Sequence, residues 1–272
     1  MNPSDANRFQ HFFQENKYTF LKNYLYNYIL RKMAVEKSLQ SDNTELILEV
    51  GSGISPVMTR SRDIIYSDLS FAAIQLLKHS YGKGYYVVAD GINLPFKSGV
   101  FSHAISSEVF EHLWDDRQAI KEIARVMKSS GRFIVTFPHR KFYFAIDDRF
   151  VGHFRRYEIN EMVDRLKDAG FRPIFIKKVL GPLEKVTMCF AVFCFSIIQK
   201  FNFEKVKSPR NLMMMDIFSS IFKWANRYYA ILVWLDARIM PRALSTVLLI
   251  NSILPDKPVE KDFGKKPYKR ES

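Results

Sequence analysis

Short apolar runs alternate with segments in which apolar residues recur every three or four positions, from residue 45 to residue 179. The short runs are predicted to be strands. They lie at residues 46–50, 64–68, 85–90, 103–107, 132–137 and 171–176. Strands that alternate with helices predict a mostly parallel sheet covered by helices on both faces.

The segments between these runs carry helix signals. Ser70 follows the second run and is predicted to cap a helix that extends through Leu77. An apolar stripe from Ala119 to Met127 predicts a helix that stops before Gly131. A similar stripe over residues 159–166 predicts a further helix, which the glycine at position 170 terminates.

The alternation is absent on either side of this region. An aromatic N-terminal segment (residues 1–44) precedes the alternating core (45–179). An apolar and basic segment (180–243), a final strand (244–255) and a Lys-rich tail (256–272) follow it. The tail is predicted to be disordered. Residues 7–38 contain neither Gly nor Pro and carry aromatics at helical spacing, so they are predicted to be helical. The final strand is expected at residues 245–250.

Composition narrows the partners and the compartment. The formal net charge is +13, which favours an anionic partner such as nucleic acid, an acidic membrane surface or a phosphorylated substrate. Cys189 and Cys194 are the two cysteines, and both lie in an apolar run. A disulfide framework is therefore not expected, which fits a reducing compartment. The N-terminal residues lack the pattern of a signal peptide. These features predict a cytoplasmic protein.

Three acidic residues close successive predicted strands. Glu49 precedes the turn Gly51-Ser-Gly53, Asp68 ends the second strand and Asp90 ends the third. Nucleotide-like ligands bind at this edge in open α/β sheets. A dinucleotide fingerprint would place a third glycine where Pro56 stands, and no P-loop motif is present.

This arrangement resembles the class I S-adenosylmethionine-dependent methyltransferases, in particular their small-molecule, ubiquinone-type branch (type 11). The resemblance covers roughly residues 45–180 and rests on Glu49-Val-Gly-Ser-Gly53, on Asp68, on the segment 89–96 (ADGINLPF), on Ser107 with the following EVFEH, and on the segment 123–133. Ser55 stands where a third glycine is common in the family. The positions that the resemblance places at S-adenosylmethionine are Glu49, Gly51, Ser52, Gly53, Asp68, Leu69, Asp90, Gly91 and Ser107.

The resemblance implies transfer of a methyl group from the sulfonium of this cofactor to an acceptor. That reaction needs in-line alignment above all, and a base where the acceptor is a hydroxyl or an ammonium. The candidate bases are His112, His153 and Tyr157, although His112 also suits a structural role.

The segment Gly152-His-Phe-Arg-Arg-Tyr157 resembles a loop that borders the acceptor in this branch. Arg155 and Arg156, with Glu108 after the fourth strand, are therefore candidate substrate-binding residues. A solvated loop that caps the next helix is an equal alternative. The scattered histidines and the cysteine pair carry no metal signature, so no metal site is predicted.

The resemblance also implies the whole fold, an α/β three-layer sandwich around a mostly parallel seven-stranded sheet. Its last two strands are antiparallel, which makes residues 180–243 a helical insertion between them. Residues 186–198 carry no charge, too short a run to span a membrane but suited to an interfacial helix beside cations. Trp224, Tyr228, Tyr229 and Trp234 are aromatics of the kind found at membrane interfaces.

These features predict peripheral association with the inner face of an anionic membrane and a small or lipid-linked methyl acceptor. A helical lid or a dimer interface is the alternative role for the insertion. RNA or protein methylation, and a non-catalytic scaffold, are the other functions considered. Nucleic acid is disfavoured because residues 106–109 (SSEV) lack the motif of base-methylating enzymes. The acceptor atom, the acceptor itself and the oligomeric state stay open.

Overall fold

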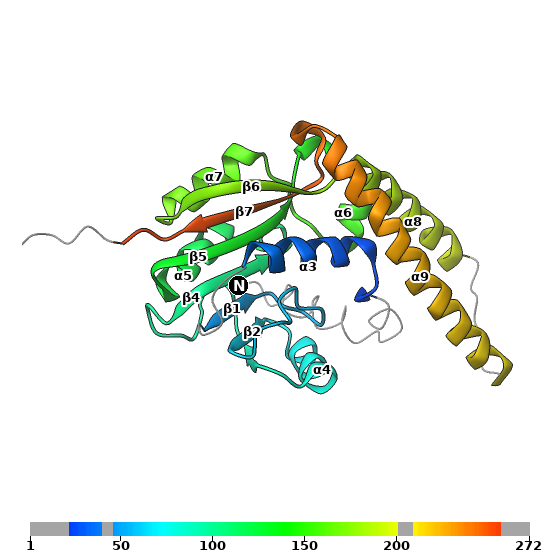
Figure 1. The fold of residues 1–272 in the computed structure, drawn as a ribbon, viewed down its shortest axis with the longest axis horizontal. Helices are drawn as coiled ribbons and strands as arrows, with labels where there is room; N and C mark the ends of the chain where they lie inside the picture. Colours follow the sequence, from blue (N-terminus) through cyan, green and yellow to red (C-terminus); the bar gives the residue numbers. More distant parts are fainter. Residues whose placement is uncertain (1–21, 40–45, 201–208, 257–272) are drawn as a thin grey trace, which may run out of the picture.

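A single seven-stranded sheet forms the centre of the protein (Figure 1). The computed structural model describes residues 22–39, 46–200 and 209–256, and for residues 194–200 and 209–219 it describes the backbone only. The strand order is β3-β2-β1-β4-β5-β7-β6, and only β7 runs antiparallel to its neighbours. The strands are β1 (Ile47–Val50), β2 (Ile64–Asp68), β3 (Tyr85–Val88), β4 (Phe101–Ser107), β5 (Met127–Pro138), β6 (Arg172–Leu180) and β7 (Val247–Ile253). The predicted mostly parallel, seven-stranded α/β sheet is confirmed.

Helices cover both faces of the sheet and so make three layers (Figure 1). The described helices are α3 (Tyr26–Ser38), α4 (Phe71–Tyr81), α5 (Asp116–Val126), α6 (Ile146–Val151), α7 (Ile159–Asp168), α8 (Pro182–Lys200) and α9 (Pro209–Ile239), with short 3-10 turns η1 (Phe110–His112), η2 (Lys141–Tyr143) and η3 (Arg242–Leu244). Apolar side chains of α5 and α7 pack on one face, whereas those of α3, α4 and α9 pack on the other.

Local signals explain why these elements begin and end where they do. All four residues of β1 are buried, as expected for a central parallel strand. Ser70 Oγ accepts a hydrogen bond from Ala73 N at 3.2 Å, which confirms the predicted cap of α4. Gly82 ends α4 in the left-handed conformation, with φ of 67°.

Some predicted boundaries are wrong. Met127 belongs to β5 rather than to the preceding helix, because α5 ends at Val126 and Met127 pairs with Phe101. Its side chain packs in the same apolar cluster as Ile123, so apolar spacing alone does not separate the two. The third strand ends at Val88, two residues before Asp90.

The predicted N-terminal helix is interrupted at residues 23–25 within the described residues. α3 begins at Tyr26, because Leu25 before it is extended, with φ −68° and ψ 136°. Tyr24 therefore lies outside the helix. The other residues of the predicted helix before position 22 lie outside the described residues, as does the predicted tail after position 256.

The insertion between β6 and β7 is helical, as predicted. α8 leaves the end of β6, and α9 returns past α3, with which it is in contact, to β7 (Figure 1). The uncharged run 186–198 is the middle of α8, and β6 extends to Leu180. In the described part of the chain, no helix combines the length and the apolar character that crossing a membrane requires.

Candidate functional site

The carboxyl ends of β1, β2, β3 and β4 meet at one edge of the sheet, because these strands are parallel neighbours. Strand order reverses between β1 and β4, which is where open α/β sheets bind ligands. The turn at Gly51–Gly53, Asp68, Asp90 and Ser107 all follow or end these strands. The structure therefore brings the predicted cofactor residues to a common edge.

Asp68 connects the first turn to the second strand. Its Oδ2 accepts a hydrogen bond from Gly53 N at 2.8 Å, and its Oδ1 accepts one from Ser70 N at 2.9 Å. Burial raises the pKa of this carboxyl, and the two backbone donors act in the opposite direction. A carboxylate accepts about four hydrogen bonds. Asp68 thus retains acceptor capacity for a pair of ligand hydroxyls while it holds the glycine turn in place.

Gly51 allows the turn to pass close to the residues after β4. Its φ is 73°, and a Cβ at this position would lie 2.4 Å from Val109 Cγ2. Gly51 N and Ser52 N both donate to Ser67 O, at 2.8 and 3.0 Å. The turn therefore depends on glycine both for its conformation and for the space beside Val109.

The substitution Gly51→Ala is expected to destabilise the protein by about 1–3 kcal/mol, from the unfavourable φ and the overpacking against Val109. Urea denaturation measures the change. Gly82→Ala is the matched control, because Gly82 also has positive φ but has open space around its Cβ position. A loss at Gly51 no larger than at Gly82 would contradict the role of Val109.

Glu49 lies beneath this turn. Its Oε1 and Oε2 accept hydrogen bonds from Val57 N at 2.7 Å and Met58 N at 3.1 Å. Burial raises its pKa to about 8, although these two donors lower it. The carboxylate thus organises the loop after the turn, and contact with the cofactor stays a prediction.

The other predicted cofactor positions surround the same edge. Asp90 Oδ1 accepts from Ile92 N at 3.2 Å, which orders the short turn that contains Gly91. Ser107 Oγ lies 2.8 Å from Thr136 Oγ1. Leu69 directly follows Asp68, and the Oγ atoms of Ser52 and of the neighbouring Ser55 are buried without a hydrogen-bond partner among the described residues.

These features fit S-adenosylmethionine. The carboxylates of Asp68 and Asp90 suit ribose hydroxyls and an exocyclic amine, since both groups are donors. The turn presents backbone without side chains at Gly51 and Gly53, and the buried hydroxyls of Ser52 and Ser55 beside it have no hydrogen-bond partner in the described part of the chain. The donors and acceptors of this edge therefore match the polar parts of the cofactor.

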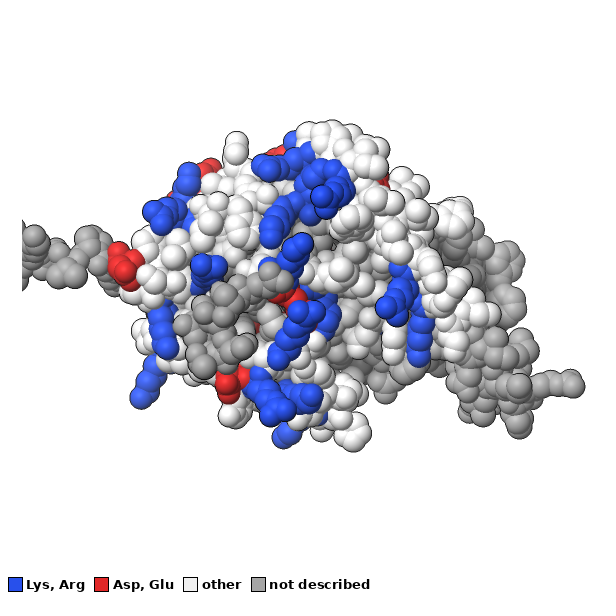
Figure 2. Space-filling model, in the orientation of Figure 1, with Lys and Arg blue, Asp and Glu red and all other residues white. Residues whose placement is uncertain are grey.

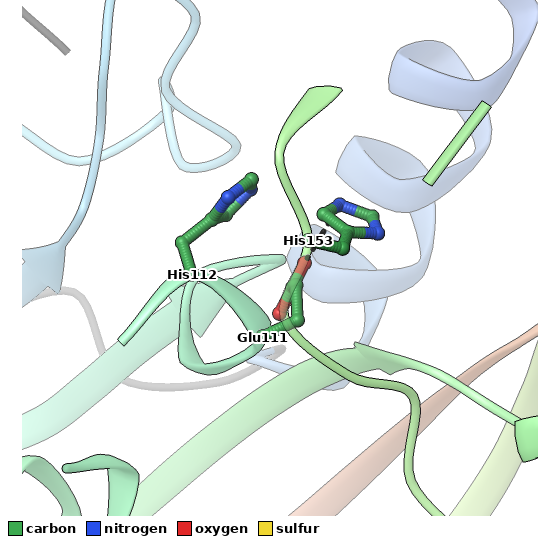
Figure 3. Close-up of side chains that lie close together, drawn as sticks. All are labelled: Glu111, His112 and His153. Carbon is green, nitrogen blue, oxygen red and sulfur yellow. Dashed lines mark ion pairs between the residues drawn. The ribbon is translucent and has the colours of Figure 1, made fainter. Parts of the chain in front are cut away.

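Two of the three candidate bases lie together beyond β4. The rings of His112 and His153 have centroids 4.7 Å apart, and His153 Nε2 lies 3.7 Å from Glu111 Oε1 (Figure 3). Glu111 is fully buried, and burial with the nearby Glu108 carboxylate raises its pKa well above its usual range. Glu108 has φ of 56°, and its buried Oε1 accepts no hydrogen bond from the described residues.

Sequence reasoning missed Glu111. Its position next to His112 is visible in the sequence, but only the fold brings His153 beside it. The loop from α6 to α7 supplies His153, whereas η1 supplies Glu111 and His112. Such a contact between distant segments leaves no local pattern.

Tyr157 does not join this group, which corrects its prediction as a base. Its hydroxyl donates to Asp116 Oδ2 at 2.7 Å, and its ring is packed in the core beneath α5 and α7. Arg155 also contacts Asp116, at 3.3 Å, and donates to Trp114 O. Both side chains are engaged by the protein itself, so the prediction that Arg155 binds substrate is not supported by its contacts.

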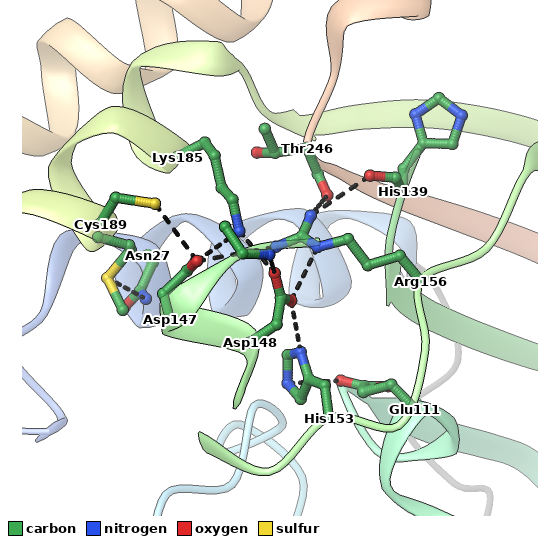
Figure 4. A network of polar contacts seen from close by, with 12 residues as sticks. Asn27, Glu111, His139, Asp147, Asp148, His153, Arg156, Lys185, Cys189 and Thr246 are labelled. Atoms are coloured by element: carbon green, nitrogen blue, oxygen red, sulfur yellow. Dashed lines mark hydrogen bonds and ion pairs between the residues drawn. The ribbon is translucent and has the colours of Figure 1, made fainter. Parts of the chain in front are cut away.

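Arg156 is likewise internal. It is 5% exposed, and its Nε donates to Asp148 Oδ1 at 2.8 Å (Figure 4). Its Nη1 donates to the carbonyl oxygens of His139 and Thr246, both at 3.3 Å. The predicted phosphate-binding arginine therefore ties the loop after α6 to the ends of β5 and β7.

The same buried network anchors the insertion. Lys185 of α8 contacts Asp147 and Asp148 of α6, each at 2.6 Å (Figure 4). Burial opposes the charge of Asp148, but hydrogen bonds from His153 and Lys185 and the charge of Arg156 hold its pKa below the usual range. α6, α8 and the loop with His153 are thus held together by one set of charges.

Comparisons with known proteins agree with this site. Residues 48–135 match the family model described as a methyltransferase domain. A probable S-adenosylmethionine-dependent methyltransferase of Mycobacterium tuberculosis is 28% identical over 123 residues, 44% of this chain and 45% of that protein. Tocopherol O-methyltransferase of Arabidopsis thaliana is 38% identical over 93 residues, 34% of this chain and 24% of that protein. The chain thus spans less than half the length of these curated relatives.

Solved structures share the fold over nearly the whole chain. A methyltransferase of Thermotoga maritima, described as a possible histamine N-methyltransferase, has a TM-score of 0.59 at 15% identity, covering 92% of this chain and 99% of that one. Phosphoethanolamine N-methyltransferase 2 of Haemonchus contortus, in complex with S-adenosylmethionine, has a TM-score of 0.56 at 16% identity, covering 91% and 60%.

The fold is therefore that of the class I S-adenosylmethionine-dependent methyltransferases. Residues 48–135 match a methyltransferase domain, and a curated relative that is similar over 123 residues is described as S-adenosylmethionine-dependent.

Proposed function

We propose that the whole protein transfers a methyl group from S-adenosylmethionine to a small or lipid-linked acceptor at an anionic membrane surface. The observation that carries the first part is Asp68, which holds the glycine turn and keeps acceptor capacity at the switch point of the sheet. The observation that carries the second part is the set of exposed apolar side chains on the described parts of α8 and α9.

The chemistry asks little of the chain beyond positioning. The bound cofactor supplies an activated methyl group on sulfur with a neutral leaving group. The chain's residues orient the acceptor for in-line attack and accept a proton where the acceptor carries one. His112 and His153 are the candidates for that role, and their position beyond the end of β4, beside Glu111, supports it.

The apolar face of the insertion is large and aromatic. Its most exposed side chains recur at helical spacing along α8 and α9 and are Val186, Phe190, Phe193, Ile221, Trp224, Tyr228, Ile231, Leu232, Trp234, Leu235 and Ile239. The opposite side of α9 is buried through Ala230, Val233 and Ala237. Because one side of this apolar helix already packs in the protein core, its other apolar side is available to another partner.

Charge favours an anionic bilayer as that partner. The net charge is +13, and Lys and Arg predominate over Asp and Glu on the face in Figure 2. Lys223, Arg227 and Arg238 lie on α9 among the exposed aromatics. Aromatic and basic side chains on one helix are typical of interfacial binding. A lipid-linked acceptor fits such a location because it resides in the same surface.

Activity is tested with the purified protein, labelled S-adenosylmethionine and a membrane extract of the host, followed by identification of the labelled product. Label is expected in a lipid-extractable product. Absence of cofactor binding in calorimetry would overturn the enzyme assignment. Binding with label only in RNA or protein would overturn the acceptor class and retain the enzyme.

Membrane docking is tested by flotation with vesicles of phosphatidylglycerol. The double variant Trp224→Ser with Phe190→Ser is expected to bind at least about tenfold more weakly, because each side chain buries apolar area worth about 1.5–3 kcal/mol when fully covered. Trp114→Ser with Phe71→Ser is the matched control, since these residues are exposed by 80% and 61% but lie off the insertion. Equal flotation of both double variants would contradict docking through α8 and α9.

A further inference from the structure

Three side chains that can bind a metal converge beside the end of β4. Glu111, His112 and His153 each place one potential ligand atom within 4.8 Å of the other two (Figure 3). Glu111 and His112 are fixed by η1, and His153 approaches from the loop after α6. The loop is itself tied to η1, because Phe154 N donates to Glu111 O at 2.8 Å.

Glu111 is an unsatisfied buried carboxylate. It is 0% exposed, and neither Oε1 nor Oε2 accepts a hydrogen bond from the described residues. Arg31 and Arg156 act on it electrostatically but donate no hydrogen bond to it within the described chain. A buried polar group without a partner is costly, and a bound cation would satisfy this one.

The Nδ1 atom of each imidazole contacts an oxygen of the protein, which fixes the position of the ring. His153 Nδ1 lies 2.8 Å from Asp148 Oδ1, a carboxylate kept charged by Arg156 and Lys185. Because that carboxylate only accepts, Nδ1 donates, and Nε2 is the ring nitrogen that faces Glu111, at 3.7 Å from its Oε1. Histidines that bind metals have this arrangement, in which the other ring nitrogen donates to a carboxylate. His112 Nδ1 lies 3.3 Å from Gly152 O, which keeps its ring beside that of His153.

We propose that Glu111, His112 and His153 bind one divalent transition-metal ion, with Zn²⁺ as the best-suited ion. Two imidazoles and one carboxylate form a ligand set that suits Zn²⁺ and related ions rather than Mg²⁺ or Ca²⁺, which prefer oxygen. Three protein ligands leave one position open, as in catalytic rather than structural zinc sites.

The three potential ligand atoms lie within 4.8 Å of one another and must move closer together to bind one ion. Tetrahedral bonds of about 2.0–2.1 Å bring ligand atoms to roughly 3.3 Å from one another. Glu111 and His153 are already 3.7 Å apart. The open position would accept an oxygen or nitrogen of a molecule at the carboxyl end of β4. A metal ion there lowers the pKa of a bound hydroxyl, which would favour an oxygen acceptor.

The test needs no methyl transfer and so separates this proposal from the proposed function. Protein without a polyhistidine tag is stripped with a chelator and titrated with Zn²⁺ by calorimetry, and with Co²⁺ by absorption. We expect one ion per chain, visible d–d absorption of tetrahedral Co²⁺, and a rise in thermal stability on binding. Absence of saturable binding at one ion per chain would overturn the proposal.

Variants locate the site. His153→Ala is expected to weaken Zn²⁺ binding by more than the roughly tenfold to hundredfold typical for loss of an outer partner. Glu111→Gln keeps the shape and replaces the carboxyl ligand with an amide, so it is expected to fold as well as the wild type while losing the rise in thermal stability with Zn²⁺. His79→Ala, on the exposed part of α4, is the matched control and is expected to bind normally. Undiminished binding by both His153→Ala and Glu111→Gln would contradict the site.

Discussion

The substitution Asp68→Asn is expected to weaken S-adenosylmethionine binding by at least about thirtyfold, because hydrogen bonds to a charged group contribute about 1.5–3 kcal/mol each. Both oxygens of Asp68 already accept from backbone donors, and each oxygen has a further lone pair that can accept a hydrogen bond. An asparagine amide at this position has one acceptor oxygen. Its two N–H donors would face the ribose hydroxyls, which are donors as well. Calorimetry with the cofactor measures the loss.

The matched control for this prediction is Asp63→Asn. Asp63 is exposed at the start of the same strand, and its backbone rather than its side chain bonds to β1. It is expected to bind the cofactor normally. A cofactor analogue that lacks one ribose hydroxyl gives a second readout: it should bind wild-type protein more weakly, yet lose little further affinity in Asp68→Asn. Normal cofactor binding by Asp68→Asn would contradict the ribose assignment.

The central strands and the cofactor edge could be predicted because their signals are local. β1 is apolar on both faces, and a carboxylate followed by two glycines marks its end. Ser70 caps α4 through a bond that spans only three residues. Parallel order then follows from the alternation of strands and helices, which forces the carboxyl ends to one side. The antiparallel placement of the last two strands is implied by the family resemblance.

The loop after α6 could not be predicted in the same way. Arg155, Arg156 and Tyr157 looked like residues that face a substrate, but their partners are Asp116 and Asp148. An arginine that binds an internal carboxylate looks the same in a sequence as an arginine that binds a substrate phosphate. Only burial and distance separate these roles, and neither is encoded locally.

The two sides of the insertion illustrate a related limit. α9 is apolar around most of its circumference, so its pattern does not identify the side that packs on the sheet. The structure shows that Val233 is buried against it, whereas Trp224 is 65% exposed. Sequence therefore identified an apolar helical insertion, and tertiary packing decided which residues are left for a membrane.

The substitution Asp148→Ala is expected to reduce the free energy of unfolding by about 3–5 kcal/mol, the usual effect of removing one partner from a buried ion pair. Asp148 is 1% exposed and contacts His153, Arg156 and Lys185 at 2.6–2.8 Å. Without it, two buried cations share Asp147 alone, and α8 loses a principal anchor to α6. Urea denaturation in the presence of a chelator measures the change without any contribution from bound metal.

Asp168→Ala supplies the comparison that gives this result its meaning. Asp168 pairs with Arg117, but both side chains are 55% exposed, so its loss is expected to change stability by less than about 0.5 kcal/mol. Lys185→Ala tests the pairing itself. If the network acts as one unit, the double variant with Asp148→Ala is less destabilised than the sum of the two single variants, by about 0.5–3 kcal/mol. Additive losses would mean that Asp148 anchors the loop after α6 and that α8 is held independently, by apolar contacts with α9.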